Sequence, residues 1–219
     1  MVSTKRVLVI NPNSNQSVTD NLSEALEPLR ITGGPKIECV TLRDGPWGVE
    51  TQAHIEQVTL PLREMVVKHD ADAFVIACYS DPGLHVCREA TAKPVFGIQE
   101  NGILTALTRG DRFGVIALGP RSIARHLRYI RQMGVSERLA GERAVNLSVA
   151  VSEQAKSFDR LRAAGCELRD IDGADVLILG CAGMACHRQR LENELGIAVI
   201  DPTQAAVAQA LGCVMLDAN

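Results

Sequence analysis

The chain has 219 residues and a formal net charge of −3, with 46% hydrophobic, 22% charged and 3% aromatic residues. This composition is globular and argues against a disordered, collagen-like or coiled-coil chain. Because there is no basic excess and there are few aromatic side chains to stack on bases, nucleic acid and anionic membrane surfaces are disfavoured as partners.

Short β-branched runs alternate with amphipathic stretches along the whole chain. Continuous apolar strands separated by helices are typical of parallel sheets that are covered by helices on both faces. In chain order, the periodicity predicts strands at residues 7–10, 37–42, 73–77, 95–98, 113–118, 145–151, 176–179 and 197–200. The clearest helical patterns cover residues 55–69, 123–133, 184–195 and 203–216.

The strand pattern occurs twice. Residues 74–78 match residues 177–181 at an offset of 103, and the two opening strands correspond at an offset of 106. The sequence therefore predicts an α/β fold of two pseudosymmetric flavodoxin-like lobes, each a four-stranded parallel sheet flanked by helices. Residues 1–98 plus 203–219 would form the first lobe, and residues 99–202 the second.

Ligands of open parallel sheets bind beyond the carboxyl ends of the strands. Two lobes that face each other would bring both sets of strand ends to one cleft, which we predict to be the active site. The segments that the sequence places there are residues 11–15, 78–81, 119–122 and 181–183.

Cys78 and Cys181 each end a predicted strand and precede a predicted helix. Asp81 is expected to cap the helix after Cys78, with Pro82 as its first residue. A helix N-terminus is expected to lower a thiol pKa from about 8.5 toward neutrality. Two such groups on opposite sides of a carbon could remove a proton from one face and return it to the other. Reacting contacts of about 3 to 3.5 Å would place the two sulfurs roughly 6 to 7 Å apart.

Seven cysteines without a recognisable secretion signal predict free thiols in a cytoplasmic protein. No apolar run is long enough to span a membrane. The remaining cysteines are expected to be small core residues: Cys39, Cys87, Cys166, Cys186 and Cys213.

Other site chemistries have weaker support in the sequence. A cysteine hydrolase would need a histidine to activate its thiol, and none of the five histidines, His85 and His187 included, lies in a nucleophile motif. A metal site is disfavoured because Cys181, Cys186 and His187 lack a partner motif with metal-ligand spacing. Dinucleotide and triphosphate motifs are also missing from the sequence.

Four segments carry a resemblance to a known family: VINPNS at 9–14, ACYSDPGL at 77–84, PVFGIQE at 94–100 and LGCAGM at 179–184. Through them the chain resembles the aspartate/glutamate/hydantoin racemase superfamily, most closely its hydantoin racemase branch. The resemblance implies a cofactor-independent racemase without a metal, which acts on a small-molecule substrate and assembles as a homo-oligomer. Cys78 and Cys181 would be its catalytic acid/base pair.

The resemblance also implies groups that hold the substrate carbonyl oxygens where enolate charge develops. The candidates are the Asn13 side chain, the Ser14 and Ser80 groups, and the backbone N–H groups of Tyr79, Ala182 and Gly183. The loop with Asn13 could equally be a turn whose side chains bond their own backbone.

Three further features of the predicted cleft concern its acidic residues and the segment after the fifth strand. Asp81 and Glu100 are expected to be acids at helix ends rather than catalysts. Many relatives carry hydroxyl residues after the fifth strand, whereas this chain has Gly119-Pro120-Arg121. Arg121 would either clamp an anionic substituent or lie in solvent.

We therefore predict a racemase that inverts C5 of 5-substituted hydantoins or a close cyclic ureide such as allantoin. A ring carbonyl would spread the carbanion charge, which suits a weak thiol base. Arylmalonate decarboxylases are disfavoured because they lack the first thiol. An aspartate or glutamate racemase and a maleate-type cis-trans isomerase stay open as alternatives. From another class, a non-catalytic small-molecule binding protein stays open too.

Overall fold

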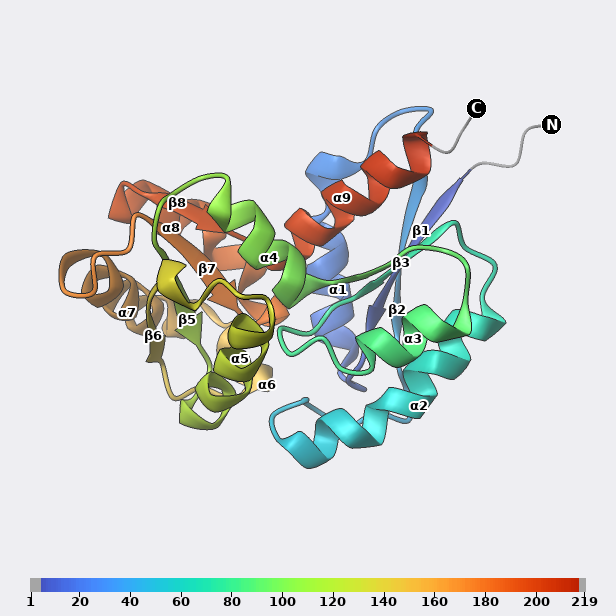
Figure 1. Ribbon diagram of the computed structural model, residues 1–219, viewed down its shortest axis with the longest axis horizontal. Helices are drawn as coiled ribbons and strands as arrows, with labels where there is room; N and C mark the ends of the chain where they lie inside the picture. Colours follow the sequence, from blue (N-terminus) through green and yellow to red (C-terminus); the bar gives the residue numbers. More distant parts are fainter. Residues whose placement is uncertain (1–4, 217–219) are drawn as a thin grey trace.

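The computed structural model describes residues 5–216, which form two four-stranded parallel sheets with helices on both faces (Figure 1). The strand order is β2-β1-β3-β4 in the first sheet and β6-β5-β7-β8 in the second, so the two sheets share one topology. The predicted fold class is confirmed.

The elements have the following bounds. The strands are β1 (Arg6–Asn11), β2 (Lys36–Thr41), β3 (Ala73–Ile76), β4 (Val95–Gly97), β5 (Phe113–Ala117), β6 (Leu139–Ala144), β7 (Val176–Gly180) and β8 (Ala198–Ile200). The α-helices are α1 (Gln16–Ala25), α2 (Gln52–Lys68), α3 (Leu84–Ala90), α4 (Ile98–Leu107), α5 (Pro120–Gln132), α6 (Val149–Ser152), α7 (Phe158–Asp170), α8 (Arg188–Leu195) and α9 (Pro202–Leu216). The 3₁₀ helices are η1 (Glu27–Leu29), η2 (Ser136–Arg138), η3 (Ala155–Ser157) and η4 (Ala182–His187).

The apolar run of β1 is explained by burial on both faces of its sheet. Successive side chains of a strand point to opposite faces. Leu8 and Ile10 pack into a cluster with the buried face of α2, whereas Val7 and Val9 pack into a second cluster that includes α9. The four residues 7–10 of this central strand are therefore all apolar, and the polar residues of β1 stand at its two ends.

Helices α4 and α9 pack against each other between the two sheets (Figure 1). Helix α4 contacts β4 of the first sheet and β5, β7 and β8 of the second, and α9 contacts β1, β3, β4 and β7. A Cβ at Gly102 of α4 would lie 2.9 Å from the Cβ of Pro202, so a glycine is needed for this close packing. The chain thus passes between the sheets through two helices in mutual contact. The division into lobes at residues 98 and 202 stays a prediction.

One predicted strand is wrong. The second strand of the second half is β6 (Leu139–Ala144), not residues 145–151. Strand β6 is half-buried along its length and, within the described chain, pairs only with β5. Two charged residues break its apolar pattern: Glu142, which is buried in a pair with His126, and Arg143, which pairs with Asp172. The more apolar residues that follow leave the sheet and form α6.

Two predicted helix starts are also wrong. Helix α3 begins at Leu84 after Gly83, whose φ is +66°, so neither Asp81 nor Pro82 starts it. Beyond Cys181 the chain first forms the 3₁₀ helix η4, and α8 begins only at Arg188. Neither cysteine therefore directly precedes the N-terminus of an α-helix. Within residues 5–216, no helix is both long and apolar enough to cross a bilayer.

Asp201, directly before α9, gives the fold a pH-dependent contribution to stability. Its Oδ1 accepts a hydrogen bond from the N–H of Thr203 (2.8 Å), while Oδ2 is buried without a hydrogen-bond partner among the described residues. Burial raises the pKa of this carboxyl to about 6, compared with about 3.9 in an unfolded chain. Between these values the folded state binds more protons than the unfolded state, so this contribution falls as pH rises.

Asp201→Asn keeps an acceptor for the Thr203 N–H but cannot titrate. We expect its unfolding free energy, relative to the original protein, to increase as pH rises from about 4 to about 6, by up to about 1.4 kcal/mol per pH unit. Urea unfolding at a series of pH values measures this. Asp72→Asn is the control, because, despite burial, the Arg6 N–H and the Lys5 ammonium hold the pKa of Asp72 below its usual value. A difference for Asp201→Asn that is constant over this range would contradict the prediction.

Candidate active site

A cavity of about 420 Å³ lies where β1, β3, β5 and β7 end, and both Cys78 and Cys181 line it. Cys78 reaches it from the first sheet directly after β3, and Cys181 from the second directly after β7. Cys78 is half-buried, and Cys181 is 7% exposed. The cavity therefore offers two thiols from two different sheets to one ligand.

Most of the predicted binding residues also line this cavity, namely Asn13, Tyr79, Ser80, Ala182 and Gly183. Ser14 is not in its wall, and its N–H donates to the carbonyl of Pro46 (2.9 Å). The segment from Gly119 to Ser122 lines the cavity as expected, with Arg121 exposed.

Asn13 lies in a turn whose side chains hydrogen-bond to the turn itself, which is one of the two possibilities that the sequence allowed. Its Oδ1 accepts hydrogen bonds from the Asn11 Nδ2 (3.1 Å) and from the Asn15 N–H (3.0 Å). Asn13 itself is 5% exposed. With its oxygen engaged in this way, Asn13 offers a ligand chiefly its amide N–H groups.

The two thiols have equivalent backbone surroundings. The backbone N–H of Ser80 lowers the pKa of the Cys78 thiol, and the backbone N–H of Gly183 lowers that of the Cys181 thiol. In both cases the donor lies two residues beyond the cysteine. Each N–H stabilises the thiolate form and lowers the thiol pKa relative to burial alone.

Burial nevertheless dominates both thiol pKa values. It raises the pKa of Cys78 to about 12 and that of Cys181 to about 11. The predicted lowering toward neutrality is therefore wrong, because neither thiol has the N-terminus of an α-helix beside it. A charge on Cys181 also raises the pKa of Cys78, so the two sulfurs interact electrostatically. Their separation of 6 to 7 Å stays a prediction.

The side chains around the two thiols differ. The Arg125 guanidinium of α5 lowers the pKa of Cys78. Its Nη1 donates to the Arg121 carbonyl (3.1 Å), and its buried Nε has no hydrogen-bond partner in the part of the chain that the structure describes. Cys181 instead has the Ser152 hydroxyl 3.9 Å from its sulfur, and this hydroxyl donates to the Val149 carbonyl (2.8 Å). Among residues 5–216, the side chain beside Cys78 is thus a cation and the side chain beside Cys181 a hydroxyl.

Sequence reasoning missed Glu50, Arg125 and His126, which also line the cavity. Glu50 comes from the loop before α2, and its Oε1 accepts a hydrogen bond from the Val149 N–H (2.9 Å). A signal for Arg125 existed, because it lies four residues after Arg121 and so on the same helix face. His126 and Glu50 follow no strand end, so the rule that found the other residues could not find them.

Most of the other cysteines and histidines lie away from the cavity. Cys87 is buried as predicted, but Cys186 is exposed, so the prediction of a core residue is wrong for it. Cys39, Cys166 and Cys213 are half-buried. His187 is buried, and its Nε2 lies 3.0 Å from the Ser152 carbonyl oxygen.

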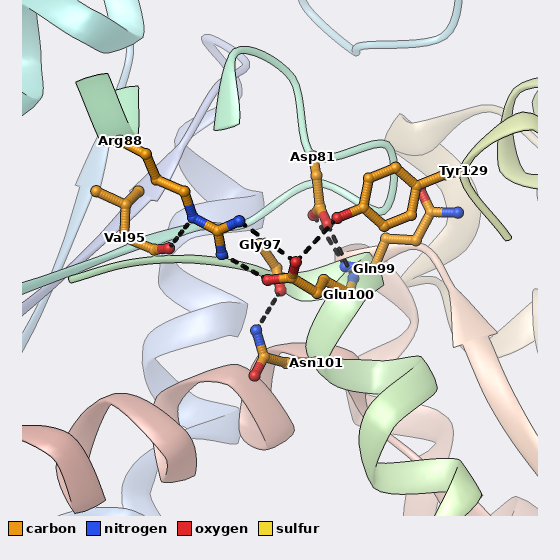
Figure 2. A network of polar contacts seen from close by, with 8 residues as sticks. All are labelled: Asp81, Arg88, Val95, Gly97, Gln99, Glu100, Asn101 and Tyr129. Atoms are coloured by element: carbon orange, nitrogen blue, oxygen red, sulfur yellow. Dashed lines mark hydrogen bonds and ion pairs between the residues drawn. The ribbon is translucent and has the colours of Figure 1, made fainter. Parts of the chain in front are cut away.

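Asp81 lies outside the cavity wall and caps a helix other than the predicted one. Its carboxylate accepts hydrogen bonds from the N–H groups of Gln99 and Glu100, both at 2.9 Å, at the start of α4 (Figure 2). Glu100 itself pairs with Arg88, with 2.6 Å between Oε2 and Nη2. Both acids are therefore found at a helix end, as expected, although Asp81 reaches its helix across 17 residues of chain.

The chain is similar to racemases in sequence and in structure. Residues 7–210 match the family described as Asp/Glu/Hydantoin racemase. The chain is 35% identical over 215 residues to the hydantoin racemase of Paenarthrobacter aurescens, covering 94% of this chain and 90% of that protein. It matches the solved structure of the allantoin racemase from Klebsiella pneumoniae with a TM-score of 0.93 at 28% identity, covering 98% of this chain and 89% of the other. The glutamate racemase structure from Francisella tularensis matches with a TM-score of 0.73 at 18% identity, covering 98% and 82% of the two chains, which is a likeness of fold.

Proposed function

The chain belongs to the Asp/Glu/hydantoin racemase family and is a racemase of the hydantoin racemase type, and from this premise we propose that it inverts C5 of a 5-substituted hydantoin or a close cyclic ureide such as allantoin. The observation that carries the proposal is the pair of thiols, Cys78 and Cys181, that reach one cavity from two sheets. The hydantoin and allantoin racemases to which the chain is similar support the choice of substrate class.

In the proposed mechanism, the substrate lies between the two sulfurs. One thiolate removes the C5 proton from one face, and the thiol of the other cysteine donates a proton to the opposite face. The first cysteine is then a thiol and the second a thiolate, so the pair is ready for the opposite enantiomer. Each reaction breaks one C–H bond and one S–H bond and forms one of each.

Negative charge moves from C5 to the adjacent ring carbonyl oxygen during this transfer. The N–H groups of Ser80 and Gly183 stabilise the thiolates of Cys78 and Cys181, whose pKa values they lower. The donors left for the carbonyl oxygen are therefore the Asn13 amide, the Ser80 hydroxyl and the backbone N–H groups of Tyr79 and Ala182. Fixed donors at such an oxygen can each be worth about 3 kcal/mol in the transition state.

The experiment that tests this function uses optically pure substrates in heavy water. A 5-alkylhydantoin, allantoin, aspartate and glutamate are incubated separately with the protein, and both optical rotation and deuterium at the α-carbon are followed. We expect loss of rotation together with deuterium incorporation for a cyclic ureide. Inversion of aspartate or glutamate alone would assign the protein to the amino acid racemases. Binding without deuterium incorporation would indicate a non-catalytic binding protein.

A further inference from the structure

The loop that carries Cys78 has an unusual backbone. Asp81 has a φ of +42°, in the left-handed region that residues with a Cβ rarely adopt. Its N–H donates to the carbonyl of Cys78 (2.9 Å), and its own carbonyl accepts from the N–H of Leu84 (3.2 Å). The conformation of Asp81 is therefore linked directly to the backbone of Cys78.

The Asp81 carboxylate fastens this loop to α4. Helix α4 has a glycine, Gly97, at its N-cap position, where no side chain can accept from the first N–H groups. Asp81 supplies both acceptors, because Oδ1 binds the N–H of Gln99 and Oδ2 the N–H of Glu100, each at 2.9 Å (Figure 2). Asp81 is 6% exposed, so solvent offers these groups little alternative.

The surroundings of Asp81 fit this contact closely. A Cβ at Gly97 would lie 2.2 Å from the Asp81 Oδ2, so only glycine leaves room for the carboxylate. The nearby carboxylate of Glu100 is drawn to Arg88 of α3, and its Oε1 accepts from the Tyr129 hydroxyl of α5 (3.2 Å), as Figure 2 shows. These hydrogen bonds and the ion pair thus connect α3, α4 and α5 next to the loop that carries Cys78.

Helix α4 is also in contact with the strand that carries the second thiol. It packs against β7, which ends directly before Cys181. A Cβ at Gly102 of α4 would lie 3.3 Å from the Ile178 side chain of β7. The loop of Cys78 and the strand of Cys181 are therefore both held against the same helix.

We propose that Asp81 is a positioning residue that sets the place of the Cys78 thiol relative to Cys181 by fastening the Cys78 loop to the start of α4. This inference rests on the proposed function, because it assigns Asp81 a part in a two-thiol reaction. Asp81 lies outside the cavity wall, so it acts through the Cys78 loop and not on the reacting atoms. We expect Asp81 to affect the fraction of deprotonated substrate molecules that receive their new proton on the opposite face.

Asp81→Asn tests the inference with little change of shape. An amide keeps one acceptor and puts N–H groups against the second backbone N–H, so the loop loses half of its attachment. We expect kcat for inversion to fall about 10²-fold, with a smaller change in KM. For the enantiomer that Cys181 deprotonates, the ratio of solvent deuterium exchange to inversion should rise, because Cys181 still removes the proton while Cys78 no longer delivers one efficiently.

Asp175→Asn is the matched control. The Asp175 carboxylate also accepts from two consecutive backbone N–H groups, those of Asp111 (2.8 Å) and Arg112 (2.9 Å), but outside the cavity wall. We expect this variant to lose stability while keeping the original kcat and the original ratio of exchange to inversion. A loss of stability alone would change the amount of folded protein but not that ratio.

Gly97→Ala gives a second variant in which Asp81 and its charge are kept. The new Cβ would displace the carboxylate from the Glu100 N–H, and the ratio of exchange to inversion should rise as in Asp81→Asn. The inference is overturned if either variant, in its folded fraction, has the kcat and the ratio of Asp175→Asn. If the Cys78→Ser and Cys181→Ser variants also racemise the substrate at the original rate, the proposed function is wrong as well. If both variants are inactive, only the proposed role of Asp81 is wrong.

Discussion

Replacing either Cys78 or Cys181 with serine is expected to lower the rate of inversion by about 10³-fold or more. A serine hydroxyl is far less acidic than a thiol, so it can neither hold the negative charge at accessible pH nor donate a proton as readily. Since both thiols line one cavity, each single substitution removes one of the two faces from which a proton can be delivered.

The two serine variants should differ from an inactive protein in one respect. Each keeps one thiol that can remove and return a proton on its own face. We therefore expect each variant to exchange the α-hydrogen of one enantiomer with solvent deuterium without inverting it, and the two variants to prefer opposite enantiomers. Optical rotation together with the deuterium content of recovered substrate measures both effects.

Cys186→Ser is the matched control for these variants. Cys186 is exposed, lies outside the cavity wall, and its thiol donates to the Glu153 carbonyl at 3.4 Å. Its replacement should leave inversion and exchange unchanged. Inversion at the original rate in both Cys78→Ser and Cys181→Ser would contradict the two-thiol mechanism.

Breaking the buried pair of His126 and Glu142 is expected to have the largest effect on stability. The His126 Nδ1 lies 2.9 Å from the Glu142 Oε2, and the two side chains are 1% and 2% exposed. Burial raises the pKa of Glu142, while the hydrogen bond with His126 opposes that shift. The Tyr79 ring packs edge-on against the imidazole, with 4.9 Å between centroids. Solvent therefore has little access to either partner.

Glu142→Leu leaves the imidazole buried without its partner, and we expect a loss of about 3 to 5 kcal/mol in the unfolding free energy. The double variant His126→Leu/Glu142→Leu should recover much of this loss, since two apolar side chains leave no polar group unpaired. Urea unfolding of the two single variants and the double variant gives the coupling free energy.

An exposed ion pair provides the comparison. Glu194 lies 2.9 Å from Arg190 on α8, with side-chain exposures of 36% and 63%. Glu194→Leu should cost no more than about 1 kcal/mol. If Glu142→Leu costs no more than Glu194→Leu, the buried pair does not hold α5 against β6 in the way that its geometry indicates.

The parts of the fold that follow from local patterns were predictable. Strands buried on both faces, such as β1 and β7, have continuous apolar runs, and their alternation with helices indicates parallel sheets. Strand β6 was not predicted because Glu142 and Arg143 break its apolar pattern, and their partners His126 and Asp172 come from other parts of the fold. Apolar residues 145–151 looked more like a strand than the true one did.

The candidate site was predictable where it lies at strand ends. Cys78, Cys181 and their neighbours follow strands directly, and the repeat marks both positions. Arg125 and Glu50 reach the cavity from a helix interior and from a long loop, so their place depends on tertiary packing. The thiol pKa values were predicted in the wrong direction, because the depth of burial cannot be read from the order of elements.

The two thiols have unequal surroundings, with Arg125 beside Cys78 and Ser152 beside Cys181. This inequality can change kcat and KM for each enantiomer, but it cannot make kcat/KM differ between the two enantiomers. Mirror-image forms of a compound with one stereocentre have equal free energies in water, so their equilibrium mixture contains equal amounts of each. The quotient kcat/KM must then be the same in both directions. The guanidinium and the hydroxyl can make one enantiomer bind more tightly only by making it react more slowly once bound, to the same degree.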